Sequence, residues 1–448
     1  MRILIYFFLA VLTTSLHAQD RSYNSMNLHD LPIRYAKTSA RSLGMGGAAI
    51  AILGEPTLVS TNPAGLALFS FPAASLGQNF VRRKTPIPSH SCEDGASFFN
   101  HTQTTTEQTL VNVIVPAGRL KFAVFRETLL DLELNFESTS VLNFSADFDP
   151  FELLRTNAPS RRNTTSLEVV ENAFAVGFSA FKNLYFGASL RLVKMEFSLL
   201  EQDYFASDFS PDAASNCIRH RFAPENFYLQ RSVDARRWLN GGNVGALWRI
   251  RKSLSLGAYY THRPGADVST KIFLPAFHFA AAPQVSFPAA EDSLNWTFNL
   301  PDDFGFGFSW QKPNRLSLNF DLVRLFYRDF SAETIRAGAS PDLDLDNQWQ
   351  FRLGGEFISA KKRKLLFLPY EIQSLHLRAG YFNEPPSRLR SIVELEKDAL
   401  GRTGQSHVLT AGFGVAFRSQ GSGFRLDAGA SYSSEELRIL LSGVISIF

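Results

Sequence analysis

Residues 40–68, ARSLGMGGAAIAILGEPTLVSTNPAGLAL, predict how the rest of this 448-residue chain is organised. The stretch is almost uncharged and rich in small residues, among them Gly44, Gly46 and Gly47. Residues without bulky side chains allow one stretch of backbone to pack closely against another on every side. The composition therefore predicts a segment that is enclosed by other parts of the chain, like a plug inside a pore.

A short helix is predicted to begin near the end of this stretch, at Asn62, Pro63, Ala64 and Gly65. Asparagine is a favoured helix N-cap, and proline fits the first helical position because its φ angle is already suitable. Glycine then allows the backbone to bend again. We expect this turn to set how the small-residue run enters the surrounding structure.

After residue 72, segments of alternating apolar and polar residues recur to the end of the chain. From Leu184 to Leu192, the even-numbered residues are apolar and the odd-numbered ones are Tyr, Gly, Ser and Arg. The same alternation occurs at residues 254–260, 316–322 and 424–430. A period of two with one apolar face predicts β-strands, in either a soluble sandwich or a transmembrane barrel.

The lengths of the connections distinguish these two folds. Short and long connections alternate along about fourteen predicted strands, as in outer-membrane barrels with short periplasmic turns and long external loops. The short ones are residues 116–118, 182–183, 251–253, 312–314, 360–364 and 419–423. The long ones are residues 85–107, 138–163, 202–226, 274–291, 331–346 and 383–404. We therefore expect an all-β fold, a transmembrane β-barrel of about fourteen antiparallel strands.

Charged residues in the predicted strands indicate which face lines the lumen, because charge is costly on a lipid-facing surface. The residues expected to project inward are Arg191, Asp321, Arg378, Arg425 and Asp427. The last strand, residues 437–448, alternates imperfectly and does not reveal which of its faces meets lipid.

Several segments resemble the long-chain fatty-acid transporter family of bacterial outer-membrane proteins, the FadL/TodX type. ARSLGMGGA at residues 40–48 and NPAGLA at residues 62–67 resemble the N-terminal hatch of that family. Residues 294–330, 377–386 and 407–419 resemble later parts of it in the expected order. The resemblance implies that residues 19–72 form a hatch, with residues 73–448 as the barrel around it. The hatch motif then comprises Asn62, Pro63, Ala64, Gly65, Gly44, Gly46 and Gly47.

Residues 1–18 are predicted to be a secretory signal that is cleaved before Gln19. Arg2 precedes an apolar run at residues 3–12, and Ala18 occupies the last position before the expected cleavage. The run is short for an anchoring transmembrane helix. Together with the barrel pattern, the signal predicts a location in the outer membrane of a Gram-negative bacterium.

Composition limits the partners and the chemistry. A formal net charge of +3 points to no nucleic-acid partner. Asp342, Asp344 and Asp346 lack the glycine and the final acid of a calcium loop, so no metal is expected. No Ser/His/acid set falls at one rim of the predicted barrel, and we expect neither enzymatic activity nor a cofactor. The resemblance implies contacts with outer-membrane lipids, lipopolysaccharide and, through the terminal Phe448, the barrel-assembly machinery.

The two cysteines of the chain, Cys92 and Cys217, both fall in predicted external loops. An oxidising envelope would allow them to form a disulfide, but the sequence does not show whether they are close enough. The pairing is therefore left open.

The external loop at residues 274–289 is apolar and uncharged, although its position should face water. Such patches mark ligand or partner sites, although these side chains could also simply cap the barrel mouth. The resemblance implies that loops after strands five and seven shape a first groove that captures the ligand. The capture residues are then Phe277, Phe279, Val285 and Phe287, with Tyr204, Phe205 and Phe209 from the loop after strand five.

The function implied by the resemblance is passage of hydrophobic small molecules, such as long-chain fatty acids, by passive diffusion through the plugged barrel. The alternative is a barrel of the same superfamily that acts in surface-protein docking or as a secretion shuttle. The two share the hatch signals, so those residues do not discriminate between them. An apolar interior favours transport, whereas a wide polar mouth favours docking.

Overall fold

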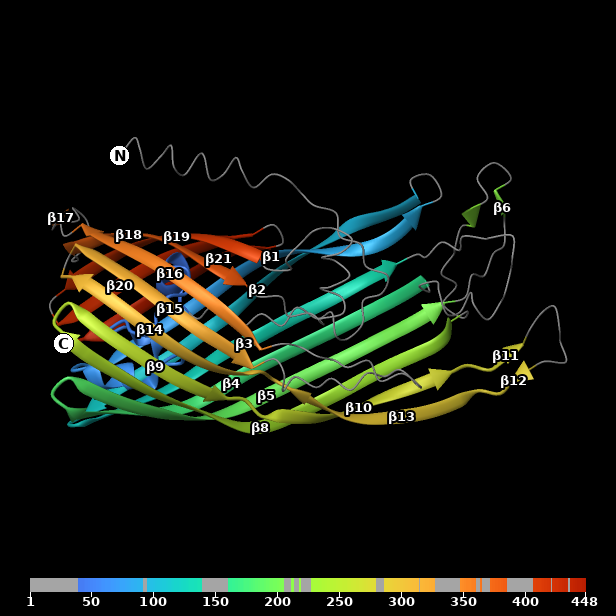
Figure 1. Cartoon of the computed structure of the whole chain (residues 1–448), viewed down its shortest axis with the longest axis horizontal. Coiled ribbons are helices and arrows are strands. Elements are labelled where there is room, and N and C mark those ends of the chain that lie inside the picture. The colour runs from blue at the N-terminus through green and yellow to red at the C-terminus, as the bar shows by residue number, and fades with distance from the viewer. Residues whose placement is uncertain are drawn as a thin grey trace.

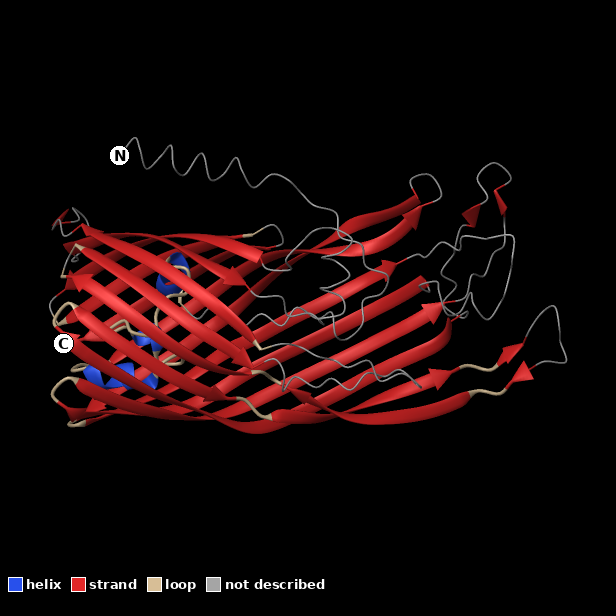
Figure 2. Cartoon of the chain, in the orientation of Figure 1, coloured by secondary structure: helices blue, strands red, loops and turns tan. Residues whose placement is uncertain are grey.

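The computed structural model describes residues 39–91, 95–138, 160–204, 211–212, 217–218, 227–278, 286–313, 315–326, 347–359, 363–364, 371–384, 406–419, 421–433 and 436–448. Strands dominate this part of the chain, and short helices lie within the ring that the strands form (Figure 2). In the described ranges, no helix has both the length and the apolar character needed to cross a bilayer. The predicted signal and Cys92 fall outside these ranges.

Fourteen antiparallel strands close into a barrel because the first, β1, pairs with the last, β21 (Figure 1). The predicted barrel is therefore confirmed. Its strands are β1 (Ala73–Ser91), β2 (Gly95–Ala117), β3 (Leu120–Ser138), β4 (Ser160–Phe181), β5 (Leu184–Tyr204), β8 (Phe227–Arg251), β9 (Leu254–His262) with β10 (Gly265–Leu274), β13 (Ala290–Asn299) with β14 (Asp302–Lys312), β15 (Leu316–Phe326), β16 (Gln348–Ser359), β18 (Glu371–Glu384), β19 (Ser406–Ser419), β20 (Ser422–Tyr432) and β21 (Glu436–Ile447).

Two barrel strands are each interrupted once, between β9 and β10 and between β13 and β14. Pro264 lies at the first break and Pro301 at the second, and proline cannot donate a hydrogen bond to the neighbouring strand. Short strands outside the main ring are β6 (Pro211–Asp212), β7 (Cys217–Ile218), β11 (Phe277–His278) and β12 (Ser286–Phe287). A further two-residue strand, β17 (Arg363–Lys364), pairs with β18 at the opposite end.

The outward face of the barrel changes from apolar to polar along each long strand. On β5, Leu190 and Leu192 are exposed on the outside, with 68% of Leu190 accessible. Beyond Leu192 on β5, Lys194 and Glu196 face outward, whereas Met195 and Phe197 are buried inside. The membrane therefore surrounds the part of the barrel that begins at the short turns, and the long strands continue beyond it.

The inward face changes in the opposite sense. Near the short turns, β5 presents Gly187, Ser189 and Arg191 to the lumen, and further along it presents Val193 and Phe197. The five charged residues predicted to project inward, Arg191, Asp321, Arg378, Arg425 and Asp427, have mostly buried side chains facing the lumen. The inside is therefore polar within the membrane and apolar directly above it, and on β5 it becomes polar again at Glu201 and Asp203 near the strand end.

The last strand, whose faces the sequence left undecided, follows the same rule. Leu441, Ile445 and Ile447 of β21 are exposed on the outer surface, whereas Ser442 and Val444 are buried toward the lumen. Pairing with both β20 and β1 fixes this register. Closure of the barrel, which is a tertiary feature, thus decides which face meets lipid.

The wall is incompletely hydrogen-bonded between β2 and β3. Their pairing ends at Leu110 and Glu127, close to a register shift between Thr128 and Leu130. Beyond this level, β2 pairs with β1, and β3 pairs with β4. Figure 1 shows β1 and β2 rising away from the remaining strands.

The change of polarity along β5 predicts where a charge is tolerated. Leu190→Arg should destabilise the barrel by about 2 to 4 kcal/mol, because it places a cation on the lipid face. Ser198→Arg lies on the same face beyond the apolar band and should have little effect. Unfolding by urea from liposomes measures both, and equal losses would contradict this position of the membrane.

Candidate functional site

The lumen is occupied by the segment that opens the described part of the chain, residues 39–72, which we call the hatch segment. It contains three short helices, α2 (Ala40–Gly44), η2 (Pro56–Leu58) and η3 (Pro63–Leu68). They lie inside the ring of strands, near the end with the short turns (Figure 2). The predicted domain limits, 19–72 and 73–448, remain a prediction because residues 19–38 are outside the described ranges.

The helix predicted at Asn62 and Pro63 is confirmed as η3. The Asn62 side chain accepts a hydrogen bond from the Ala64 amide at 3.1 Å, as an N-cap does. The amide nitrogen of the same side chain donates to the carbonyl oxygens of Ile50 (3.0 Å) and Ala246 (3.2 Å). Since Ala246 belongs to β8, one side chain caps the helix and also joins it to the wall.

A belt of wall glycines surrounds the hatch segment, which packs so closely that there is no room for a side chain at these wall positions. A Cβ on Gly412 would lie 3.0 Å from the Cα of Gly44, and Gly380 lies equally tightly against Gly46. We call this set the glycine belt: Gly177, Gly187, Gly245, Gly257, Gly307, Gly354, Gly380, Gly412 and Gly429. Many of them face one another across neighbouring strands, such as Gly177, Gly187 and Gly245.

The small residues of the hatch segment thus pack against small residues of the wall. Gly46 and Gly47 also adopt φ angles of 64° and 76°, which favour glycine. The wall glycines were missed in the sequence, although their signal was present as glycines on the inward face at one level of successive strands. Recognising it requires the register between strands.

Two charged residues of the hatch segment, Arg41 and Glu55, belong to a buried ion network with the wall. Arg41 contacts Glu55 at 2.7 Å and Glu356 of β16 at 2.5 Å. Glu55 also pairs with Arg425 of β20 at 2.6 Å. The network continues in the wall through Arg378, which lies 2.7 Å from Glu356.

The electrostatics of the network favour the charged forms of its hatch members. Burial by itself would raise the pKa of Glu55, but the guanidinium groups of Arg425 and Arg41 outweigh burial and lower its pKa to about 2. Burial would likewise lower the pKa of Arg41, but the carboxylates of Glu356 and Glu55 raise it well above its ordinary value. Removing one partner would leave buried charge without compensation.

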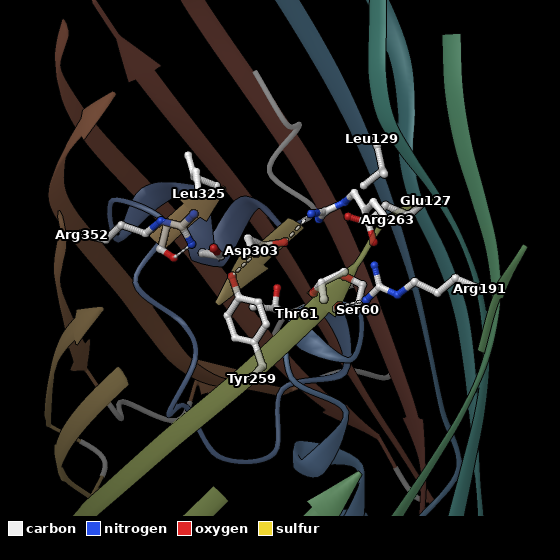
Figure 3. Close-up of a pocket in the computed structure, with 13 residues that line it drawn as sticks. Ser60, Thr61, Glu127, Leu129, Arg191, Tyr259, Arg263, Asp303, Leu325 and Arg352 are labelled. Atoms are coloured by element: carbon white, nitrogen blue, oxygen red, sulfur yellow. Dashed lines mark hydrogen bonds and ion pairs between the residues drawn. The ribbon is translucent and has the colours of Figure 1, made fainter. Parts of the chain in front are cut away.

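A cavity of about 80 Å³ lies on the side of the hatch segment that faces the upper lumen (Figure 3). Its walls include Ser60 and Thr61 of the hatch segment and several charged side chains from the strands. Arg191 pairs with Glu171 at 2.5 Å, and Arg263 pairs with Asp303. The cavity has room for a few water molecules.

One cation at this cavity has no carboxylate partner within the described residues. Arg352 of β16 donates to the Gln350 side chain at 2.8 and 2.6 Å and to the carbonyl oxygen of Gly47 at 3.5 Å. Figure 3 shows it beside Leu325, across the cavity from Arg191 and Glu127. Asp321 lies opposite Arg352 across β15 and β16. A guanidinium that makes no direct ion pair is suited to bind an anionic group.

Above the cavity, the inward face forms a continuous apolar cluster, which we call the lumen cluster. It includes Leu129, Leu132, Leu134, Leu167, Val169, Val193, Met195, Phe197, Leu199, Val233, Val268, Phe298, Leu300, Val323 and Leu325. Leu129 and Leu325 also line the cavity, so the two regions are continuous. Sequence reasoning did not identify these residues, because alternation alone does not show which part of an inward face lies above the hatch segment.

The predicted capture residues are described only in part. Tyr204 is buried at the end of β5, where its hydroxyl donates to Gln202 at 2.9 Å. Phe277 and Phe287 are paired across β11 and β12. Phe205, Phe209, Phe279 and Val285 lie outside the described ranges. The capture role of all seven remains a prediction, as does the role of the hatch motif in closing the lumen.

A closed barrel with an apolar outer band and an occupied lumen defines the class of plugged outer-membrane barrels. In a comparison with known protein families, the family model described as outer membrane protein transport protein (OMPP1/FadL/TodX) matches residues 33–366. The chain belongs to this family of transport proteins, which is not enzymatic. Family and fold together indicate a bacterial outer-membrane protein. Cleavage of the signal remains a prediction.

Solved structures show the same fold at low sequence identity. A Pseudomonas aeruginosa FadL homologue is 13% identical, with a TM-score of 0.58 over 93% of this chain and 99% of its own. The toluene transporter TbuX of Ralstonia pickettii is 16% identical, with a TM-score of 0.53 over 91% and 97%. The CymD monoaromatic hydrocarbon channel is 14% identical, with a TM-score of 0.54 over 91% and 96%. No curated protein matches the sequence.

The glycine belt predicts a difference between two adjacent glycines of β16. Gly354 faces Met45 of the hatch segment, whereas Gly355 makes no contact closer than 3.6 Å. Gly354→Ala should displace the hatch segment and raise the ion conductance of the barrel in planar bilayers. Gly355→Ala is the matched control and should leave the conductance unchanged. Equal conductance in the two variants would show that the belt does not seal the lumen.

The ion network predicts a response to acid. Glu55 has a pKa lowered from 4.5 to about 2, so its stabilisation is present above about pH 4.5 and is lost as the pH falls toward 2. Conductance should therefore stay low down to about pH 4.5 and rise below it. Glu55→Gln should destabilise the closed arrangement by roughly 3 to 5 kcal/mol and remove this dependence. Glu133→Gln, on the exposed outer face, is the control, and an unchanged acid response in Glu55→Gln would refute the assignment.

Proposed function

We propose that this protein carries hydrophobic small molecules across the outer membrane by passive diffusion, and that long-chain fatty acids are the class that its lumen suits best. The observation that carries this proposal is the lumen cluster, an apolar lining placed directly above the cavity and the hatch segment. The relatives named as toluene transporters and a monoaromatic hydrocarbon channel support hydrophobic compounds in general.

The choice of a fatty acid over a neutral hydrocarbon rests on Arg352. An acyl chain would contact the lumen cluster, while its carboxylate would reach the guanidinium at the base of that cluster. Burial of the chain contributes about 0.8 kcal/mol for each CH₂ group. A neutral hydrocarbon of the same length would be stabilised equally by burial but would form no ion pair with Arg352.

Passage needs movement in the protein, because a cavity of about 80 Å³ does not hold an acyl chain. The ligand would displace side chains of the lumen cluster and then move past the hatch segment. The wall can also open between β2 and β3, because these strands are not paired with each other beyond Leu110 and Glu127. The gradient of the ligand supplies the driving force, and no energy source is required.

The docking alternative is less well supported. Docking would require a wide polar mouth, whereas the inward faces of β3, β4 and β5 are apolar directly above the cavity and become polar only near the strand ends, as at Glu201 and Asp203. An apolar interior has no evident use in binding a surface protein, but it lowers the free energy of a hydrophobic molecule in transit. Transport is therefore the function that the arrangement supports best.

The lumen cluster can be tested on one strand. Leu132→Asn combined with Leu134→Asn should weaken binding of both oleate and toluene by about tenfold or more, since each leucine contributes roughly 1.5 to 3 kcal/mol when fully buried. Glu133→Gln lies between them on the outer face and is the control. Binding to the purified barrel is measured by calorimetry, and uptake by cells that lack other transporters. Unchanged binding in the double variant would count against transport through this lumen.

The fatty-acid assignment has a separate test. Arg352→Gln should weaken binding of oleate by about tenfold or more and leave toluene unchanged, because a charge-assisted hydrogen bond contributes roughly 1.5 to 3 kcal/mol. Arg324→Gln removes a cation from the outer face, where it stacks on Trp349, and serves as the control. Equal loss for both ligands would indicate damage to the lumen, and no loss for oleate would refute the fatty-acid preference.

A further inference from the structure

The end of the barrel with the short turns has an unbalanced positive charge. Residues 117–121, 181–184, 249–254, 311–316 and 417–423 contain nine lysines and arginines and no aspartate or glutamate. The remaining connection at this end, residues 360–370, adds four more in the sequence KKRK, and the acid next to it is Glu371, which lies opposite Arg418 across β18 and β19. We call the nine residues in the five short turns the basic rim. It lies on the periplasmic side, where such barrels have their short turns.

Within the described part of the chain, the basic rim has no ion pair with a carboxylate. The Lys121 ammonium donates to the carbonyl oxygen of Gly118. Arg418 lies over the ring of Phe448, 5.2 Å from its centroid, and Arg249 lies 6.0 Å from that of Tyr185. The contact with Tyr185 turns Arg249 toward the lumen, whereas Arg119, Lys182, Lys252 and Lys312 in the turns are exposed.

At the opposite boundary of the apolar band, several outward-facing cations are paired with carboxylates, whereas Arg126, Lys271 and Arg324 have no ion pair among the described residues. Lys194 and Arg236 both lie 2.8 Å from Glu196. Arg162 lies 2.6 Å from Glu137. Carboxylates therefore accompany the cations at the upper boundary, whereas the five short turns contain cations alone.

The position of the rim indicates what it meets. Next to its turns are large exposed apolar side chains, with 71% of Phe181, 50% of Trp248 and 51% of Phe448 accessible. Lys182 directly follows Phe181 in the sequence, a distance of about 3 Å at the rise of a strand. Each headgroup layer of a bilayer is roughly 5 to 7 Å thick. The cations therefore lie at the level of the inner-leaflet phosphates, and the turns are too short to carry them past it.

We propose that the basic rim binds the headgroups of anionic phospholipids, such as phosphatidylglycerol, in the inner leaflet of the outer membrane. Guanidinium and ammonium groups donate charge-assisted hydrogen bonds to phosphate oxygens. Near an anionic lipid surface, each basic residue increases affinity by roughly fivefold. A ring of such contacts fixes the height of the barrel in the membrane at the end where the hatch segment lies.

The test compares lipid selectivity of the purified barrel in vesicles of phosphatidylcholine, using spin-labelled phosphatidylglycerol and spin-labelled phosphatidylcholine. The native protein should prefer phosphatidylglycerol several-fold, and about 1 M salt should abolish the preference because the Debye length falls to about 3 Å. The rim variant combines Arg119→Gln, Lys182→Gln, Lys252→Gln and Lys312→Gln. In this variant, the ratio of the affinity for phosphatidylglycerol to that for phosphatidylcholine should fall close to one.

Two further variants separate the rim from general effects. Arg126→Gln, Lys194→Gln, Arg236→Gln and Lys271→Gln together remove the same number of cations from the upper outer face and should leave the preference unchanged. Lys182→Arg, Lys252→Arg and Lys312→Arg keep the charge and should also leave it unchanged, in a barrel whose folding is checked by heat modifiability. The proposal is overturned if the native protein shows no preference, if the rim variant retains it, or if the upper variant loses it equally. It is also overturned if the rim variant loses affinity for lipopolysaccharide but not for phosphatidylglycerol.

Discussion

Direct contact between the backbone of the hatch segment and the backbone of the wall is the constraint on which the rest of the structure depends. Gly412 against Gly44, and Gly380 against Gly46, leave no space for a Cβ on either side. Interiors at this packing density do not absorb added atoms without displacement. The fit explains why small residues are needed on both partners at these contacts.

Charged and polar groups determine how the hatch segment is oriented against the wall. Arg41 and Glu55 pair with each other and with Glu356 and Arg425 of the wall, in an interior where an unpaired charge is costly. Asp321 of β15 accepts hydrogen bonds from the amides of Ala49 and Ile50, at 2.5 and 3.0 Å. Glycine contacts set how closely the hatch segment approaches the wall, whereas these polar contacts select one orientation for it.

The opposite polarity gradients on the two faces connect the fold to transport. Outside, the apolar band ends where Lys194 and Glu196 begin, and inside, apolar residues begin at Val193. A hydrophobic molecule therefore meets an apolar interior before it reaches the polar level of the hatch segment. The same strand thus provides a lipid-facing surface in one half and a ligand-facing surface in the other.

The sequence by itself determined the barrel, because strand periodicity and the alternation of loop lengths are local properties of the chain. It also determined the helix at Asn62 and Pro63, whose capping involves neighbouring residues. Only the tertiary structure decided that Ile445 of β21 faces outward and that Gly412 meets Gly44, because both depend on register between strands far apart in sequence. The lumen cluster and the partners of Glu55 were hidden for the same reason: alternation shows that a strand has two faces, but closure of the barrel and its depth in the membrane determine what each face meets.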